Sequence, residues 1–230
     1  MSFIKCIDNA GYKVGRQRAF CDFLTLTVCA FSAREKETQY KEVSSRYTAN
    51  ELKHFSEALF HLIEEMDNHG QGLKDCLGDY FMEVLASERR GQFFTPQTIC
   101  DFMAQILQPE GETVSDPCCG SGRMFLSAAK VNRFLRFYGA DIDLQCCQMT
   151  LINMCLNGLF GEVSHMDTLQ FTEWRRWRIE KHPIYQIPYI REIDLTEVKP
   201  TPEILKHSPK PEIKAIQTTL DSLFSSSELF

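Results

Sequence analysis

The stretch that decides the fold of this chain of 230 residues reads Asp116-Pro117-Cys118-Cys119-Gly120-Ser121-Gly122. It follows a predicted short strand and opens a predicted helix. The two glycines allow the backbone to turn sharply and to approach a ligand, because no Cβ stands in the way. The helix that follows presents unpaired N–H groups and the positive end of its dipole. The stretch therefore predicts a loop that holds a polar or negatively charged ligand at the end of a strand.

The sequence around this loop alternates between strand and helix patterns. The predicted strands are residues 113–116, 135–141 and 163–167, and the predicted helices are residues 121–131 and 143–156. Alternation at this spacing is typical of a parallel sheet built from βαβ units. A further helix is predicted to start with Thr95 as its cap and Pro96 at its first position, and to end near Leu107.

The N-terminal part of the chain carries apolar residues at helical spacing. Three such stripes begin at Phe20, Leu52 and Leu73, and either Thr48 or Asn50 can cap the second helix. We predict three regions: an N-terminal helical region over 1–90, a core over 91–198 and a proline-rich tail over 199–230. The tail is predicted to run as an extended linker.

The composition sets limits on the class of protein. Hydrophobic residues make up 43% and charged residues 24% of the chain, which is ordinary for a soluble globular protein. No apolar run approaches the roughly 18 residues of a membrane span, and the first residues lack the apolar segment of a secretory signal. We therefore expect a cytoplasmic location and no membrane partner.

The ten cysteines and the net charge of −6 also carry information. No Cys-x-x-Cys pair occurs, so the sequence favours reduced, buried thiols over a zinc site or a disulfide framework. We expect no bound metal. An acidic net charge does not favour strong binding of a nucleic acid by this chain alone.

A second signal follows the glycine loop by about 20 residues. Gly139-Ala140-Asp141 ends the next predicted strand, where a carboxylate can accept hydrogen bonds from both hydroxyls of a ribose. A dinucleotide and S-adenosyl-L-methionine are the two competing cofactors. A dinucleotide site favours a third glycine where this chain has Phe125, and Asp116 would repel a pyrophosphate but attract the ammonium group of a methionine. The pattern favours S-adenosyl-L-methionine.

Two motifs in this order resemble a known family. The segment Gly91–Pro96, GQFFTP, precedes the loop Asp116–Gly122, and together they resemble the modification subunit of type I restriction-modification systems. More broadly they resemble the gamma-type adenine-N6 DNA methyltransferases, as does the stretch Leu77–Tyr80. The resemblance covers about residues 50–169. It implies an α/β fold with a Rossmann-like class I SAM-dependent methyltransferase sheet, mostly parallel and of the seven-strand type, behind an N-terminal helical region.

The resemblance also implies roles for individual residues. The Phe-Thr-Pro segment contacts the methionine end of the cofactor, the glycine loop wraps the cofactor, and acidic residues after the second and third strands bind its ribose and adenine. The residues carried over as cofactor-binding are Phe94, Thr95, Pro96, Asp116, Pro117, Cys119, Gly120, Ser121, Gly122, Asp141, Ile142, Asp167 and Thr168.

The catalytic motif of the family, Asn or Asp followed by two prolines and an aromatic residue, does not occur in its standard form. The nearest segment, Gln186–Tyr189, begins 19 positions after Asp167, where a fourth strand is expected to end. One interpretation is an altered catalytic loop, in which Gln186 accepts hydrogens of the adenine amine, Pro188 is the retained proline and Tyr189 stacks on a flipped base. It predicts that Gln186 and Tyr189 face the cofactor pocket. The other is an unrelated strand or turn with an exposed tyrosine.

The resemblance implies DNA as the substrate and a separate specificity or restriction subunit as a partner. The segment Trp174–Arg178, WRRWR, suits phosphate contact and base stacking. The flanking Glu173 and Glu180 favour instead an amphipathic turn whose tryptophans pack inward. The rival to an adenine-N6 methyltransferase is a catalytically inactive interaction subunit that keeps the fold and the cofactor pocket.

Overall fold

The computed structural model describes residues 2–33, 35–85, 93–109 and 111–196. The described residues up to Leu195 form one compact unit. The predicted tail over 199–230 lies outside the described residues, as do Gly91 and Gln92. The helical region and the core therefore belong to one unit, and the division predicted between them at residue 90 stays a prediction.

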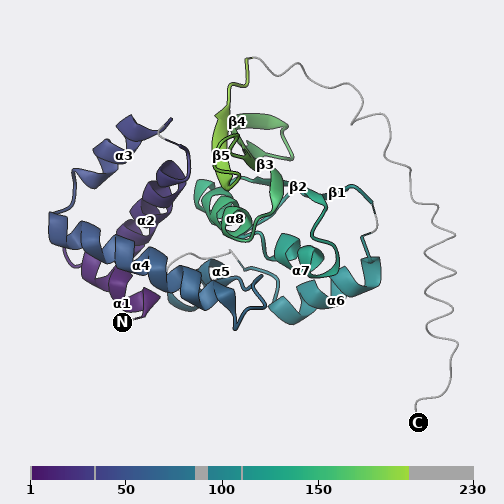
Figure 1. The fold of residues 1–230 in the computed structure, drawn as a ribbon, viewed down its shortest axis with the longest axis horizontal. Helices are drawn as coiled ribbons and strands as arrows, with labels where there is room; N and C mark the ends of the chain where they lie inside the picture. The colour runs from purple at the N-terminus through teal and green to yellow at the C-terminus, as the bar shows by residue number, and fades with distance from the viewer. Residues whose placement is uncertain (1, 34, 86–92, 110, 197–230) are drawn as a thin grey trace, which may run out of the picture. The chain divides into compact units, whose positions relative to one another are not determined.

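Helices build the N-terminal half of this unit (Figure 1). They are α1 (Phe3–Ala10), α2 (Arg16–Ala30), α3 (Glu37–Ser44), α4 (Ala49–Asp67), α5 (Cys76–Tyr80) and the π-helical segment η1 (Phe81–Leu85). Thr48, not Asn50, caps α4: its side chain accepts from the backbone of Glu51, and the Glu51 side chain accepts from the backbone of Thr48. The three predicted stripes thus lie mainly on α2, on α4 and on the α5–η1 segment.

Aromatic rings hold these helices together. Phe3 of α1 makes edge contacts with Phe23 of α2 and Tyr80 of α5, with ring centroids 5.3 and 5.2 Å apart. Phe55 of α4 lies edge-on to Tyr47 at 4.8 Å. Such aromatic pairs add to the stabilisation that burial of the rings provides.

Five strands form one sheet in the order β1-β2-β3-β4-β5. They are β1 (Thr113–Asp116), β2 (Arg136–Asp141), β3 (Phe160–Asp167), β4 (Thr172–Lys181) and β5 (Pro188–Ile193). The helices of this half are α6 (Gln97–Leu107), α7 (Arg123–Val131) and α8 (Leu144–Leu156). The predicted alternation of strands and helices between residues 113 and 167 is confirmed. The fold is α/β and Rossmann-like.

The first three strands run parallel, so their carboxyl ends meet at one edge of the sheet. Asp116 pairs with Gly139 in the β1–β2 register, and Asp141 pairs with His165 in the β2–β3 register. Asp116, Asp141 and Asp167, the last residues of these strands, are therefore brought to the same edge.

The last two strands correct the expectation of a mostly parallel sheet. β4 pairs antiparallel with β3, and β5 pairs antiparallel with β4. The connection from Asp167 to Thr172 is too short for the crossover that a parallel neighbour requires, so the chain turns back as a hairpin. The sheet is mixed.

The WRRWR segment lies within β4, not in a turn. Trp177 packs inward at 2% exposure, as expected, whereas Trp174 is 46% exposed. The three arginines of the segment, Arg175, Arg176 and Arg178, each pair with a glutamate. Glutamates of the same sheet neutralise the charges of these arginines. The interpretation of the segment as a nucleic-acid contact therefore gains no support.

Helix α8 joins the two halves of the unit, because it contacts β2 to β5 and also α2. Helix α7 packs against β1. Gln148 of α8 donates to Thr25 Oγ1 of α2 at 3.1 Å, and the backbone N–H of Ile190 in β5 donates to the Phe31 carbonyl at 2.9 Å.

The cysteines are thiols, and most of them are buried, as expected from the sequence. Among the residues that the structure describes, no helix is long and apolar enough to span a membrane. In the same residues, no group of three or more His, Cys, Asp or Glu side chains is arranged to hold a metal ion.

Candidate cofactor site

The glycine loop between β1 and α7 is held in a conformation that requires glycine at two positions. Gly120 has a φ of +56° and Gly122 a φ of +81°, values that other residues adopt only with strain. A Cβ on Gly120 would lie 3.1 Å from the Phe94 ring, and one on Gly122 would lie 3.1 Å from the Thr150 side chain. The Cys119 N–H donates to the Ala140 carbonyl of β2 at 2.9 Å, which fastens the loop to the sheet.

The three aspartates at the ends of the parallel strands all bind backbone N–H groups. Asp116 accepts from Cys118 at 3.0 Å, and Asp167 accepts from the two residues that follow Thr168, both at 3.0 Å. Asp141 accepts from Gly120 at 2.9 Å through one oxygen and from Asp143 at 2.9 Å through the other. Because a carboxylate has about four acceptor sites, Asp141 can also accept from the hydroxyl groups of a ligand.

The electrostatics of Asp141 differ from those of a paired carboxylate. Burial raises its pKa above the ordinary value, and the backbone hydrogen bonds from Asp143 and Gly120 only partly oppose that rise. Asp141 is a partly buried carboxylate held by backbone dipoles, and no arginine or lysine in the described part of the chain binds it. Such a group favours a ligand that brings its own hydrogen-bond donors.

Two adjoining hollows open at this edge of the sheet. The larger has a volume of about 390 Å³ and the smaller about 80 Å³. Four residues line both hollows: Phe93, Phe94, Cys118 and Gly120. The carboxylate of Asp116 belongs to the smaller one, whereas Asp141 and Asp167 belong to the larger one. We call the two hollows together the cleft.

Most of the residues predicted to bind the cofactor line this cleft. Thr95, Cys119 and Ser121 lie in its smaller part, and Pro117, Ile142 and Thr168 lie in its larger part.

Pro96 and Gly122 do not line either hollow. Pro96 is the N-cap of α6 and not its first helical residue, so the helix starts one position later than predicted. Gly122 is the N-cap of α7. The Ser121 hydroxyl points away from the cleft and donates to Asp75 at 2.5 Å, so Ser121 can serve the cleft only through its backbone.

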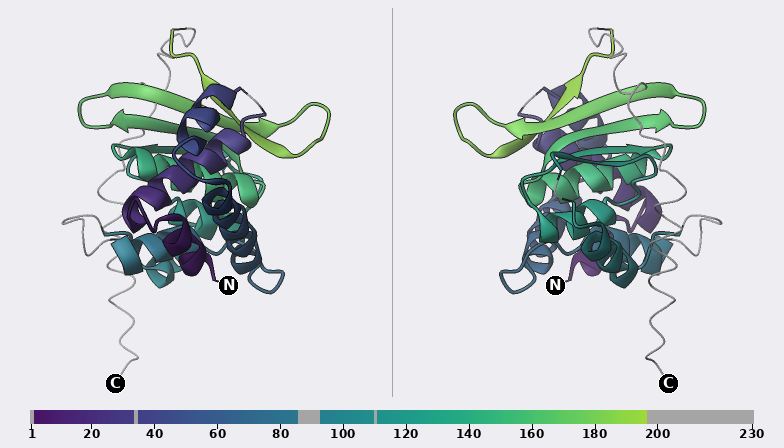
Figure 2. Two further views of the ribbon diagram at one scale, coloured as in Figure 1. Left: turned by 90° about the vertical axis from the view of Figure 1, so that its left-hand side faces the viewer. Right: turned by 90° about the vertical axis from the view of Figure 1, so that its right-hand side faces the viewer.

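The predicted catalytic residues lie elsewhere. Ile179 near the end of β4 pairs with Gly161 at the start of β3, and Lys181 pairs with Pro188 of β5. The turn that contains Gln186 therefore lies by the amino end of β3, whereas the cleft lies at the carboxyl end. Figure 2 shows the two hairpin turns at opposite ends of the β4 ribbon.

The side chains of these residues are also engaged locally. Tyr189 donates its hydroxyl to Glu180 at 3.0 Å, and the Gln186 amide donates to the Pro183 carbonyl at 3.1 Å. This placement contradicts the expectation that Gln186 and Tyr189 face the cofactor pocket. The physical reason is the short hairpin after β3, which carries this segment away from the carboxyl edge of the sheet.

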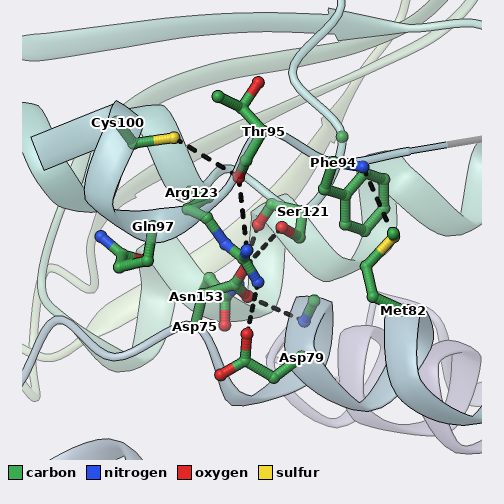
Figure 3. A network of polar contacts seen from close by, with 12 residues as sticks. Asp75, Asp79, Met82, Phe94, Thr95, Gln97, Cys100, Ser121, Arg123 and Asn153 are labelled. Atoms are coloured by element: carbon green, nitrogen blue, oxygen red, sulfur yellow. Dashed lines mark hydrogen bonds and ion pairs between the residues drawn. The ribbon is translucent and has the colours of Figure 1, made fainter. Parts of the chain in front are cut away.

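A buried polar network that was not predicted from the sequence lies behind the glycine loop (Figure 3). Its centre is Asp75, which is 1% exposed and receives hydrogen bonds from Ser121, Arg123 and Asn153. The available signal is the presence of Arg123 and Asn153 within helices that are mainly apolar. Such residues are buried only when they have partners.

Comparison with known proteins agrees with this geometry. The model of the N-6 DNA Methylase family matches residues 73–187, which is half of the chain and includes the whole cleft. The chain belongs to this family. No solved structure matches the chain.

Three curated relatives illustrate the similarity. A type I restriction enzyme MjaIX methylase subunit from Methanocaldococcus jannaschii is 31% identical over 105 residues, which are 40% of this chain and 19% of that protein. A HindI methylase subunit from Haemophilus influenzae is 28% identical over 116 residues, 44% of this chain and 26% of that protein. The type II methyltransferase M.VspI from a Vibrio species is 30% identical over 105 residues, 43% of this chain and 26% of that protein. The matched part thus spans about a fifth to a quarter of each relative's length.

Proposed function

We propose that the chain binds S-adenosyl-L-methionine in the cleft. The observation that carries the proposal is the meeting of Asp116, Asp141 and Asp167, from three successive parallel strands, at two hollows that share a wall. Sites of this kind lie outside the carboxyl ends of parallel strands. The volume of the larger hollow, about 390 Å³, is in the ordinary range for small-molecule sites.

The chemistry of the residues in the cleft fits this cofactor. Asp116 in the smaller hollow would hold the ammonium group of the methionine by charge attraction. Asp141 would accept from the ribose hydroxyls, and Asp167 with Ile142 would border the adenine. When bound, the cofactor supplies an electrophilic methyl group. The residues named here bind and orient it.

We further propose that the methyl acceptor is the N6 amine of adenine in DNA. Membership of the N-6 DNA Methylase family supports this assignment. The names of the relatives, which include type I restriction enzyme methylase subunits, support DNA and a separate specificity subunit as partners. The amine is a poor nucleophile, so transfer requires groups that accept its hydrogens and a base extruded from the duplex.

A second function has one observation in its favour. Gln186, Pro188 and Tyr189 lie by the amino end of β3, so they do not contribute an acceptor at the cleft. That placement favours a SAM-binding interaction subunit that does not itself transfer the methyl group.

Two measurements on the purified chain separate these functions. Calorimetric titration with S-adenosyl-L-methionine tests the cleft, and tritium transfer from the labelled cofactor to unmethylated DNA tests the reaction. DNA already methylated at adenine N6 serves as the matched substrate control. Binding with transfer supports the enzyme, binding without transfer refutes methyl transfer by the chain acting alone, and the absence of binding refutes both functions.

A further inference from the structure

A single buried carboxylate links the helical region to the glycine loop. Asp75 precedes α5 and accepts four hydrogen bonds. One oxygen accepts from the Gly78 N–H and the Asn153 amide, both at 2.8 Å. The other oxygen accepts from the Ser121 hydroxyl at 2.5 Å and from Arg123 Nε at 2.8 Å. Four donors fill the acceptor capacity of a carboxylate.

Arg123 carries the connection further. Its guanidinium, which pairs with Asp75 through Nε, also donates to Asp79 at 2.6 Å and to the backbone carbonyl of Thr95 at 3.3 Å (Figure 3). Thr95 lines the smaller hollow of the cleft. Asp75 and Arg123 together therefore connect three segments that are far apart in the chain: α5, the Phe94–Thr95 segment and the glycine loop.

The packing around this carboxylate leaves no spare room. A Cβ on Gly78 would lie 2.1 Å from an oxygen of Asp75 and 2.5 Å from the Ser121 hydroxyl. Real Cβ atoms do not approach so closely, so glycine at this position allows α5 to approach the Asp75–Ser121 hydrogen bond.

Two side chains of α8 bind consecutive backbone carbonyls of the glycine loop. The Asn153 amide donates to the Ser121 carbonyl at 2.8 Å, and the Thr150 hydroxyl donates to the Gly120 carbonyl at 2.9 Å. With the Ser121 side chain bound to Asp75, the loop backbone has a fixed orientation, and its other side faces the cleft.

We infer that Asp75 is a positioning residue for the cofactor site: it acts through Ser121 and Arg123 to preorganise the glycine loop and Thr95 before a ligand binds. The inference rests on the proposed binding of S-adenosyl-L-methionine. Preorganisation reduces the ordering that binding must otherwise impose on a loop. Asp75 lines neither hollow of the cleft, so its effect on binding would be exerted through the residues that it holds, Ser121 and Arg123, both of which line the smaller hollow.

The test substitutes Asp75→Asn, which keeps the size of the side chain but removes its charge and half of its acceptors. We expect the Kd for S-adenosyl-L-methionine to rise about tenfold or more, the size of effect produced when one or two immobilised groups must be reordered. We also expect faster hydrogen–deuterium exchange in peptides that cover residues 117–124 of the ligand-free protein.

A second variant reaches the same network by steric means. Gly78→Ala changes no charge, and alanine has the higher intrinsic helix propensity. Its Cβ would nevertheless displace Asp75 or Ser121, so we expect weaker binding and faster exchange in the same peptides.

Asp22 provides the matched control. It is a buried aspartate of α2 that accepts from Arg18 at 3.1 Å, Arg46 at 3.1 Å and Tyr47 at 2.8 Å, and none of these residues lines the cleft. Asp22→Asn should lower the melting temperature but leave the Kd and the exchange of the loop at wild-type values.

The outcomes separate this inference from the proposed function. Wild-type Kd and wild-type loop exchange in a folded Asp75→Asn or Gly78→Ala variant would overturn it. An equal rise in Kd for Asp22→Asn would also overturn it, because general loss of stability would then explain the effect. If the wild-type chain binds no S-adenosyl-L-methionine, the proposed function fails, and the exchange measurement alone still decides whether Asp75 orders the loop.

Discussion

The two halves of the sheet use their carboxylates in opposite ways. In the parallel half, Asp116, Asp141 and Asp167 stand at strand ends, receive backbone N–H groups and face a cleft. In the antiparallel half, glutamates and arginines pair across the strands. Three pairs join neighbouring strands: Arg175–Glu192 at 2.8 Å, Arg178–Glu162 at 2.6 Å and Arg191–Glu180 at 2.6 Å. A fourth pair, Arg176–Glu173 at 2.7 Å, lies within β4.

The pKa values of the two halves differ accordingly. Burial raises the pKa of Asp141. Burial alone would also raise the pKa of Glu192, but hydrogen bonds from Arg175 and Lys36 outweigh it and hold that pKa below the ordinary value. The difference teaches that charge density alone does not locate a ligand site. The arginines of β4 form ion pairs within the sheet, whereas Asp116, Asp141 and Asp167 remain available to a ligand.

The largest effect on binding is expected at Asp141. Asp141→Ala removes the proposed acceptors of the ribose hydroxyls and the partner of the Gly120 N–H, so it should weaken S-adenosyl-L-methionine binding by about 1–3 kcal/mol. Calorimetric titration measures the change. Glu192→Ala, the equivalent deletion in the antiparallel half, should leave the Kd unchanged. An unaltered Kd for Asp141→Ala would contradict the contrast between the halves.

A smaller effect, on the free energy of unfolding, is expected at Gly122. Gly122→Ala forces a side chain into a φ of +81° and against Thr150. The left-handed conformation alone costs about 1–2 kcal/mol of unfolding free energy, and the contact adds to it. Gly158→Ala is the matched control, because its φ is +66° but no atom lies within 4 Å of the added Cβ. Urea unfolding should show the greater loss for Gly122→Ala, and equal losses would mean that the contact with Thr150 is unimportant.

Acidification should separate binding from folding. The raised pKa of Asp141 means that it gains a proton above the ordinary aspartate value of about 3.9, and binding through its charged form weakens as the pH falls toward that raised pKa. The lowered pKa of Glu192 has the opposite consequence. Its contribution to stability is present above the ordinary glutamate value of about 4.3 and is lost as the pH falls through its lower folded-state pKa.

Affinity should therefore fall at a higher pH than the circular dichroism signal of the fold. Asp141→Asn, which cannot titrate, should flatten the pH dependence of the Kd. A simultaneous loss of affinity and of folded structure in the wild-type chain would count against this assignment.

The smallest effect on binding is expected in the β4–β5 turn. Tyr189→Phe removes the hydrogen bond to Glu180 and should cost about 0.5–1.5 kcal/mol of stability without changing the Kd for S-adenosyl-L-methionine. Gln186→Gly should be accommodated, because Gln186 already has a φ of +56°. Loss of methyl transfer in either folded variant would restore a catalytic role for this turn.

The parallel half could be predicted because its signals are local. Each acidic residue stands at the end of its own strand, and the glycines lie within a few residues of the Asp116 carboxylate. Parallel strands then bring their carboxyl ends together without further information.

The antiparallel half was assigned wrongly, although two local signals were present. Only four positions, 168–171, separate β3 from β4, too few for the crossover to a parallel strand. The alternation of buried Trp177 and Ile179 with the more exposed Arg176 and Arg178 also marks a strand, but the high charge of the segment obscured it.

The sequence hints that Arg123 and Asn153 are buried, but it could not predict that Asp75 is their shared partner. Its partners Ser121, Arg123 and Asn153 follow Asp75 by 46, 48 and 78 positions. No periodicity connects residues at such separations, because the contacts depend on how the helices pack in three dimensions.

The contact between α2 and α8 has a consequence for folding during synthesis of the chain. Gln148 reaches back 123 positions to Thr25, and Gln145 reaches back 124 positions to Cys21. At a synthesis rate of about 5–20 residues per second, α2 leaves the ribosome roughly 6–25 seconds before α8 exists to cover it. During that interval the apolar surface of the nascent helical region stays uncovered and must avoid incorrect contacts. Its folding in the cell is therefore completed only after the sheet and its helices have been translated.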